Sequence, residues 1–282
     1  MSRRSQEELV IEAGWKGRDY WREIWRYREL FYTLAWRDIS VRYRQTIVGL
    51  AWAVLQPLLT MVVMTLVFGK LAKLSSEGAA PYALLVIAGM LPWQFFAGAF
   101  ASASQSLVAN AGLISKVYFP RMIIPAGAVV TSFVDLLIAF VILIGMMVWF
   151  QFLPDWRIVT LPFFMALAFL SATGLGLLVA ALNVKYRDFR HVIPFVVQFG
   201  LYISPVGYSS SIVRHRLGDE LFTVYCLNPM VGVIDGFRWA LLGGQAPLDG
   251  RAVGMAWASA AVILMIGVMY FRRAENTFAD VI

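Results

Sequence analysis

Four long stretches of this sequence contain no Asp, Glu, Lys or Arg. They run from 45 to 69, from Gly78 to Ser115, from Ile158 to Val184 and from Ala252 to Phe271. Each can supply the roughly 20 apolar residues that cross about 30 Å of hydrocarbon as a helix. A soluble protein would need polar surface to cover such helices, whereas 60% of this chain is hydrophobic and only 15% is charged. The sequence therefore predicts an all-α integral membrane protein.

The apolar pattern predicts six transmembrane helices, at about 47–69, 83–108, 122–150, 159–182, 191–210 and 251–271. If both chain ends are cytoplasmic, 17 of the 24 Lys and Arg residues lie on the inner side. The positive-inside rule thus favours cytoplasmic N- and C-termini. Residues 1–46 form a cytoplasmic N-terminal region, 47–271 the six-span domain, and 272–282 a cytoplasmic tail. The net charge of +7 is a topology signal, and no nucleic-acid partner is expected.

The segment from Arg28 to Arg44 is predicted to form an amphipathic helix. One face carries Thr33, Arg37, Ser40 and Arg44, and the opposite arc is apolar, with Leu30, Phe31, Leu34, Ala35 and Val41. Such a helix lies in the headgroup layer, where its basic face meets water or lipid phosphates. A solvated cytoplasmic helix is the alternative.

Residues 211–250 are too apolar for an ordinary loop, and their apolar pieces are too short to span a membrane. Asn228-Pro229 and Gly243-Gly244 interrupt them. Irregular backbone at membrane depth is tolerated only against protein or a water-filled cavity. We therefore expect short re-entrant helices that gate the outer end, with Asn228, Pro229, Asp235 and Arg238 as candidate gate residues. An amphipathic loop on the outer leaflet is the alternative.

Asp135 lies midway along the predicted third span, where a carboxylate costs roughly 2.5–3.5 kcal/mol on insertion scales. A proton or substrate site is one interpretation. We favour a structural role, with a hydrogen bond to Thr131, Ser132 or a neighbouring helix, because the spans show no second charge to relay a proton.

Several classes of enzyme are disfavoured by missing motifs. The sequence has no Walker A pattern, no HExxH and no GxSxG, and its two histidines and single cysteine (Cys226) suggest no metal site. We predict that the chain is not itself an enzyme and that it binds no cofactor or metal of its own.

Several blocks of sequence resemble one family. WRDI at 36–39 and VRYRQTIVGLAWAVLQPLLTM at 41–61 resemble the start of the first span in polysaccharide-export permeases of the type-2 ABC exporter superfamily. The resemblance continues in order, over nearly the whole chain from about residue 26, through ISKVYFPRMIIP (114–125), ALNVKYRDFRHVIPFVVQ (181–198), SPVGY (204–208), LNPMVGVIDGFRWALLG (227–243) and RRAENTFADVI (272–282).

The resemblance implies a transport function. Two copies of the chain would form the permease of an ABC transporter, beneath which two copies of a cytoplasmic ATPase bind ATP and Mg. The cargo would be a lipid-linked polysaccharide, with O-antigen favoured over capsular polysaccharide, teichoic acid, a drug or another lipid. A membrane-embedded glycolipid-processing enzyme is the alternative from another class.

The resemblance and the chemistry of the side chains together suggest three further sets of site residues. A cytoplasmic coupling helix at about 113–121 and the next inner loop would contact the ATPase through Lys116, Val117, Tyr118, Phe119, Arg121, Arg187 and Asp188. The phosphate head of the cargo and the membrane lipids would meet Arg37, Arg42 and Arg44. Aromatic side chains that stack on sugar rings would line the channel at Trp52, Trp93, Phe96, Phe195, Phe199 and Tyr202, although packing or lipid contact is the commoner role of such residues.

Overall fold

The structure is a computed structural model that describes residues 17–44, 47–73, 78, 80–152 and 154–278. For residues 17–19, 44 and 47–54 it describes the backbone alone. The side chains of Arg44 and Trp52, which are predicted head-group and channel residues, therefore lie outside the described part of the chain.

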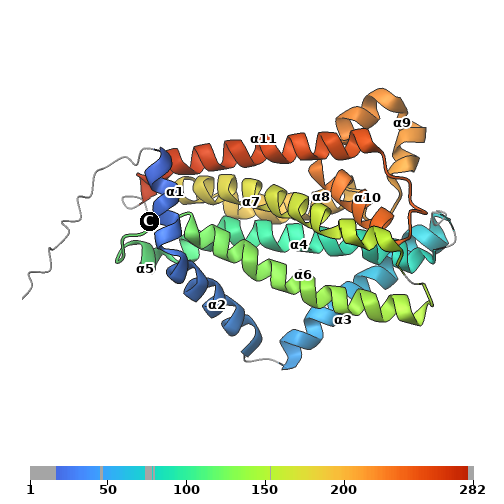
Figure 1. The fold of residues 1–282 in the computed structure, drawn as a ribbon, viewed down its shortest axis with the longest axis horizontal. Coiled ribbons are helices and arrows are strands. Elements are labelled where there is room, and N and C mark those ends of the chain that lie inside the picture. Colours follow the sequence, from blue (N-terminus) through green and yellow to red (C-terminus); the bar gives the residue numbers. More distant parts are fainter. Residues whose placement is uncertain (1–16, 45–46, 74–77, 79, 153, 279–282) are drawn as a thin grey trace, which may run out of the picture.

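The described residues are overwhelmingly helical, which confirms the all-α part of the predicted fold class. The elements are α1 (Gly17–Arg26), α2 (Arg28–Arg44), α3 (Ile47–Met64), the π-helix η1 (Thr65–Leu71), α4 (Tyr82–Ala109), α5 (Ala111–Ile114), α6 (Ile123–Trp149), the 3-10 helix η2 (Trp156–Thr160), α7 (Leu161–Lys185), α8 (Phe189–Ile203), α9 (Ser210–Tyr225), α10 (Pro229–Leu241) and α11 (Gly250–Glu275). Helices α4, α6, α7 and α11 run along the long axis of the molecule, with α1 and α5 at one end and α9 and α10 at the other (Figure 1).

Among the described residues, four segments are long and apolar enough to cross a membrane: α4, α6, Trp156–Lys185 and α11. They coincide with the predicted second, third, fourth and sixth spans. The other two predicted spans hold shorter apolar helices, Leu55–Leu71 and Phe189–Ile203. Helix α8 ends at Ile203 rather than at 210 because Pro205 follows Ser204 and disfavours a helical backbone at that serine.

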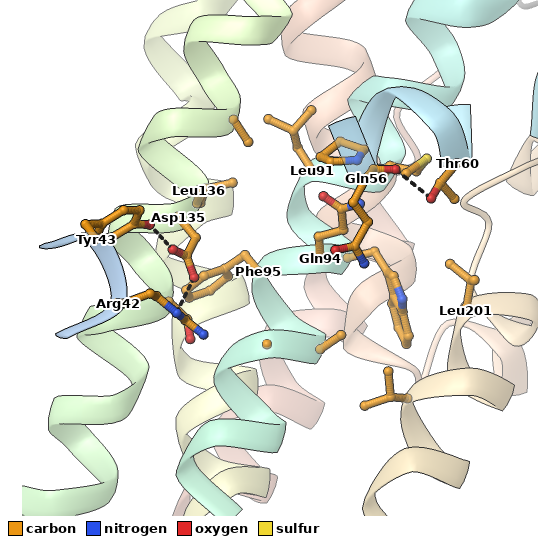
Figure 2. Close-up of a pocket in the computed structure, with 18 residues that line it drawn as sticks. Arg42, Tyr43, Gln56, Thr60, Leu91, Gln94, Phe95, Asp135, Leu136 and Leu201 are labelled. Carbon is orange, nitrogen blue, oxygen red and sulfur yellow. Dashed lines mark hydrogen bonds and ion pairs between the residues drawn. The ribbon is translucent and has the colours of Figure 1, made fainter. Parts of the chain in front are cut away.

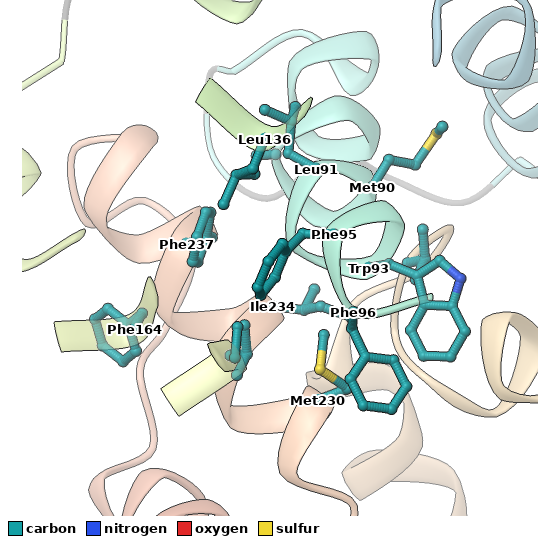
Figure 3. Packing of buried hydrophobic residues seen from close by; sticks show 14 of the residues in the cluster. Met90, Leu91, Trp93, Phe95, Phe96, Leu136, Phe164, Met230, Ile234 and Phe237 are labelled. Carbon is teal, nitrogen blue, oxygen red and sulfur yellow. The ribbon is translucent and has the colours of Figure 1, made fainter. Parts of the chain in front are cut away.

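Helix α4 lies at the centre of the hydrophobic core. Its residues from Leu84 to Trp93 are buried without interruption. One turn further on, the ring of Phe95 packs edge-on against Phe133 of α6 at 5.9 Å and is stacked with Phe169 of α7 at 6.4 Å. Figure 3 shows how aromatic and aliphatic side chains from α4, α6, α7 and α10 fill this core. The buried helix thus serves as the scaffold on which the other helices pack.

Two short helices follow α8, and they differ in burial. Helix α9 is largely exposed, whereas α10 is buried along almost its whole length against α4, α7 and α11. The Asn228 side chain caps α10 by accepting a hydrogen bond from the Met230 amide at 3.0 Å, and Pro229 occupies its first position. After α10, Gly243 and Gly244 adopt φ of +63° and +74° and turn the chain. The helix therefore breaks at the two dipeptides that the sequence indicates.

Helix α2 buries one of its sides at the base of the bundle. Leu34 and Ala35 are buried there, in contact with α6, as expected for its apolar arc. Val41 departs from that expectation because its side chain is 72% exposed. On the outward side, Tyr32 and Trp36 are exposed and stacked, with ring centroids 6.3 Å apart. The helix therefore presents aromatic side chains to its surroundings, as interfacial helices do.

Helices α7 and α11 approach each other closely at a pair of glycines. A Cβ atom added to Gly267 would lie 2.2 Å from the carbonyl oxygen of Gly174. A Cβ atom added to Gly174 would meet the backbone of Leu264 at 2.6 Å. Small residues at such crossings let two membrane helices come into backbone contact.

We predict that Gly267→Ala lowers the stability of the folded protein by about 1–3 kcal/mol, because the added methyl group must separate two packed helices. Gly254→Ala on the same helix is the matched control, since its Cβ would meet nothing within 4 Å. The control should be neutral or slightly stabilising, because alanine favours helix over glycine. Thermal unfolding of both variants in detergent, followed by tryptophan fluorescence, measures the difference; equal melting temperatures would contradict the close approach.

Candidate functional site

A cavity of about 620 Å³ lies between helices α2, α3, α4, α6 and α8 (Figure 2). Its apolar wall includes Leu91 and Phe95 of α4, Leu136 of α6 and Leu201 of α8. Its polar lining residues are Arg42, Tyr43, Gln56, Thr60, Gln94, Ser132 and Asp135. A space that combines aromatic and aliphatic walls with a few hydrogen-bonding groups is typical of a ligand site.

Asp135 is bound by two side chains of α2 at the edge of this cavity. The Tyr43 hydroxyl donates to Oδ1 of Asp135, and the Arg42 guanidinium donates to Oδ2 and forms an ion pair with it (Figure 2). Burial, together with the neighbouring carboxylate, raises the pKa of Tyr43, so the phenol stays neutral and remains a donor.

The partners of Asp135 decide between the expected alternatives for its structural role. Thr131 and Ser132 do not bind the carboxylate, since they donate to the carbonyls of Gly127 and Ala128 one turn earlier. The expected bond to a neighbouring helix is present instead, and it supplies the second charge that the spans alone lack. Arg42 is also predicted to bind the phosphate head of the cargo. In the structure Asp135 binds the same guanidinium, so a phosphate group would compete with this carboxylate.

The aromatic residues predicted to line a channel fall into two groups. Trp93 lines the cavity and is held by α8, where a Cβ added to Gly200 would lie 2.5 Å from the indole. Phe96 packs on Trp93 with centroids 5.4 Å apart and is buried. The other three lie on α8 outside this cavity, each at least half exposed: Phe195, Phe199 and Tyr202. Within one chain, α8 faces the cavity with Val197 and Leu201 instead.

The segment predicted as a coupling helix is mostly not helical. Helix α5 covers only Ala111–Ile114, and residues 115–122 form turns, so the expected helix at about 113–121 is wrong in extent. Pro120 cannot donate a helical hydrogen bond, and the β-branched Val117 and aromatic residues beside it favour other conformations. Phe119 is buried and anchors these turns, while Lys116, Val117 and Tyr118 are exposed at their tip.

Glu275 at the end of α11 connects three segments at this end of the bundle. Its Oε2 accepts from the Tyr20 hydroxyl of α1 at 2.8 Å, and its Oε1 accepts from the Arg121 amide at 2.6 Å. The Arg121 side chain also donates to the Glu275 carbonyl. Arg121, predicted to contact the ATPase, thus contacts the chain's own C-terminal helix.

The second predicted inner contact is the turn between α7 and α8. Arg187 and Asp188 are exposed there. Arg187 and Arg190 line a smaller cavity of about 340 Å³, which also touches the end of α4 and the start of α5. Of the residues predicted to contact the ATPase, Arg187 lines this cavity.

Arg238 of α10 is the centre of the predicted outer gate, and it is buried at 1% exposure. Its guanidinium donates to the carbonyls of Leu85 at 3.1 Å, Val206 at 2.8 Å and Tyr208 at 2.7 Å. These carbonyls belong to the start of α4 and to the turn after α8. Asn228 adds a bond from Nδ2 to Oγ of Ser204, at 3.0 Å, and Pro229 and Asp235 are buried nearby on α10. The gate candidates therefore hold this end of the bundle together.

The sequence analysis missed several residues of these sites. Gln56 and Gln94 carried a signal, since each is an amide within a charge-free stretch, and such polar residues inside spans point to cavities. Tyr43 and Glu275 carried none, because their partners lie 92 and 154 or more residues away in the sequence. Only the folded arrangement brings those pairs together.

Comparison with known proteins places these sites in a family. Residues 29–242 match the ABC-2 type transporter family. The chain belongs to this family. Members are membrane subunits of transporters and work with a cytoplasmic ATPase subunit, so this ABC-2 permease is not the catalytic subunit. The resemblance noted in the sequence is thereby confirmed.

Similar proteins cover nearly the whole permease. An O-antigen export system permease protein RfbA of Myxococcus xanthus is 24% identical over 259 residues, covering 92% of this chain and 97% of its own. A protein of the same name from Klebsiella pneumoniae is 23% identical, with 90% and 95% covered. The polysialic acid transport protein KpsM of Escherichia coli is 21% identical, with 85% and 91% covered.

We predict that Arg238→Lys destabilises the permease, because a lysine cannot reach all three carbonyls and each one left unsatisfied in the core costs about 1–3 kcal/mol. Arg216→Lys on the exposed helix α9 is the matched control and should leave stability unchanged. Yield and melting temperature of the purified proteins are the measurements. A stable Arg238→Lys protein would show that the guanidinium does not hold the outer end.

Proposed function

We propose that this ABC-2 permease exports a lipid-linked polysaccharide, O-antigen in the first place, across the bacterial inner membrane. Two copies of the chain would form the path, and two copies of a separate ATPase would bind ATP and Mg and supply the energy. The observation that carries the proposal is the cavity between α2, α3, α4, α6 and α8, which combines an ion pair, two glutamines and a tryptophan.

The chemistry of this cavity suits a glycan. Sugar hydroxyls exchange hydrogen bonds with side-chain amides, which Gln56 and Gln94 offer here. The apolar face of a sugar ring packs on an aromatic plane, which Trp93 offers. Because these groups are few, they favour weak and repeated contacts, as a polymer that must keep moving requires.

The exposed side of α8 supports the homodimer. Phe195 and Phe199 are in ring contact, with centroids 4.1 Å apart, and both are at least half exposed together with Tyr202. Helix α3 and η1 likewise expose a row of aliphatic side chains, namely Leu55, Leu59, Val62, Val63 and Leu66. A second copy that covers these faces would place the α8 aromatics beside the path of the glycan.

The inner end supports contact with an ATPase subunit. The exposed tip at Lys116, Val117 and Tyr118 would meet the ATPase, and Phe119 would transmit its movement to the bundle. The Arg187-Asp188 turn would form the second contact. At the opposite end, α10 with Asn228, Pro229, Asp235 and Arg238 would close the outer side until the dimer widens.

Capsular polysaccharide is the second candidate cargo. The match to the polysialic acid transport protein KpsM extends over 243 residues and supports it. The two cargoes differ in their glycan and in the lipid that carries it, so a transport assay with both substrates separates them.

The proposed function predicts ATP-dependent transfer of a lipid-linked glycan by the permease and its ATPase in proteoliposomes. Lectin capture on the far side of the membrane measures the transfer, and omission of ATP is the control. Transfer of a lipid-linked O-antigen should exceed that of a capsular glycan at least tenfold. Transfer without ATP, or without the ATPase subunit, would overturn the assignment.

The proposed six spans with both ends inside predict which cysteines an impermeant maleimide can reach from outside the cell. Native Cys226 is buried, and its burial raises the pKa of the thiol to about 11, so little reactive thiolate forms at neutral pH. In a Cys226→Ser background, Arg216→Cys on α9 should be labelled in intact cells. Lys116→Cys should be labelled only after the cells are opened; labelling from outside would reverse the topology.

A further inference from the structure

We propose that Asp135 holds Arg42 when no cargo is bound and releases it to the phosphate groups of a lipid-linked cargo. The Arg42–Asp135 ion pair is then a latch between α2 and α6 that the cargo itself displaces. The inference rests on the proposed function, because it names the step by which the head of that cargo is recognised.

The latch joins two elements at the edge of the cavity. Asp135 lies near the middle of α6, and Arg42 lies in the last turn of α2, the helix that packs diagonally on α6 (Figure 1). Both side chains line the cavity of about 620 Å³ together with Tyr43. A charged head that approaches along α2 would therefore meet the guanidinium where the glycan site begins.

The pair is accessible enough to be exchanged. The side chains of Arg42 and Asp135 are 42% and 37% exposed. Both partners also line the cavity, so a competing charged group can reach them there. A phosphate group offers two oxygens to the planar guanidinium fork and a higher charge than a carboxylate, so it competes effectively for an arginine.

Asp135 keeps a partner after the exchange. Tyr43 donates to Oδ1 and Arg42 to Oδ2, so departure of the guanidinium leaves the phenol hydrogen bond in place. The carboxylate is therefore not left bare among apolar side chains, and the energetic penalty of opening the latch is reduced. Tyr43 is a positioning residue in this scheme.

Arg37 on the same helix provides the contrast. Its guanidinium donates to Asp38 at 2.8 and 2.9 Å and to the Asn110 side chain at 3.0 Å, and it does not line the cavity. Asp38 is its neighbour on α2 itself, so this ion pair ties no second helix to α2. Arg37 is thus a suitable control for Arg42, because it lies on the same helix and forms no ion pair between α2 and α6.

A double-mutant cycle tests the exchange. The wild type, Asp135→Asn, Arg42→Gln and the double variant are placed in nanodiscs as complexes with the ATPase subunit. Native mass spectrometry then measures the binding of a polyprenyl pyrophosphate, with phosphatidylglycerol and free inorganic pyrophosphate as comparison ligands. Arg37→Gln is the control, and recovery of the intact complex verifies the folding of each variant.

Asp135→Asn should bind the polyprenyl pyrophosphate about two- to fivefold more tightly, because the freed Arg42 no longer has to leave a carboxylate. Arg42→Gln should bind it more weakly, and in that background Asp135→Asn should bring no gain. Arg37→Gln should respond to Asp135→Asn as the wild type does. A structural role of the pair alone would weaken binding in both single variants.

Three results would overturn the proposal. Weaker binding in Asp135→Asn would make the carboxylate either a structural partner of Arg42 or a direct contact of the cargo. A gain that persists without Arg42 would remove the arginine from the exchange. An equal gain for phosphatidylglycerol or inorganic pyrophosphate would assign the latch to membrane lipid or to free phosphate. If the wild type does not transport the glycan but the double-mutant cycle gives the expected result, the proposed function is wrong and the latch is retained. If transport occurs and Asp135→Asn leaves binding unchanged, the proposed function is retained and the latch is wrong.

Discussion

Buried backbone carbonyls at the breaks between helices are the constraint on which this architecture depends. A continuous helix satisfies its own peptide groups, but the chain between α8 and α10 turns repeatedly within a packed region, where water does not replace lost hydrogen bonds. Arg238 satisfies carbonyls from two sides of this turn and from α4 with a single guanidinium. Tyr82 adds a hydrogen bond to the Gly207 carbonyl. The irregular outer segment is possible because α10 brings a charged donor into the core.

At the opposite end of the bundle, a carboxylate holds the turns between helices in place. Glu275 accepts from Tyr20 of α1 and from the Arg121 amide, while Phe119 and Phe278 fill the apolar space beside it. The turns after α5 are thus fixed to the first and last helices at once. A push on the exposed tip of these turns would move α1 and α11 together, rather than deform the loop alone. This continuity gives a physical route from an ATPase contact to the whole bundle.

The sequence specifies the helices well because their signal is local. Charge-free stretches located α4, α7 and α11, a long apolar stretch interrupted only by Asp135 located α6, and the Asn228-Pro229 and Gly243-Gly244 pairs marked the ends of α10. The sites depend on pairs of residues that are distant in sequence, such as Arg42 with Asp135. A periodic pattern of apolar residues cannot predict such pairs. The predicted extent of the coupling helix was wrong for a different reason. A short apolar and aromatic stretch before Pro120 is compatible with either a helix or a set of turns, and the packing of Phe119 decides between them.

Helix α2 has two roles that make opposite demands on its side chains. On one side it leaves Tyr32 and Trp36 exposed, and on the other it buries Leu34 and Ala35 against the bundle. Arg42 and Tyr43 satisfy both demands at its last turn, because they reach Asp135 without bringing more apolar surface into the bundle. A permanent attachment of this end would call for a buried apolar contact. Such a contact stabilises by roughly 25 cal/mol for each Å² of apolar surface removed from water. An exposed ion pair is weaker and depends on competing charges. The proposed exchange thus occurs where the last turn of α2 borders the cavity, at a contact better suited to a helix that opens than to one that only supports the bundle.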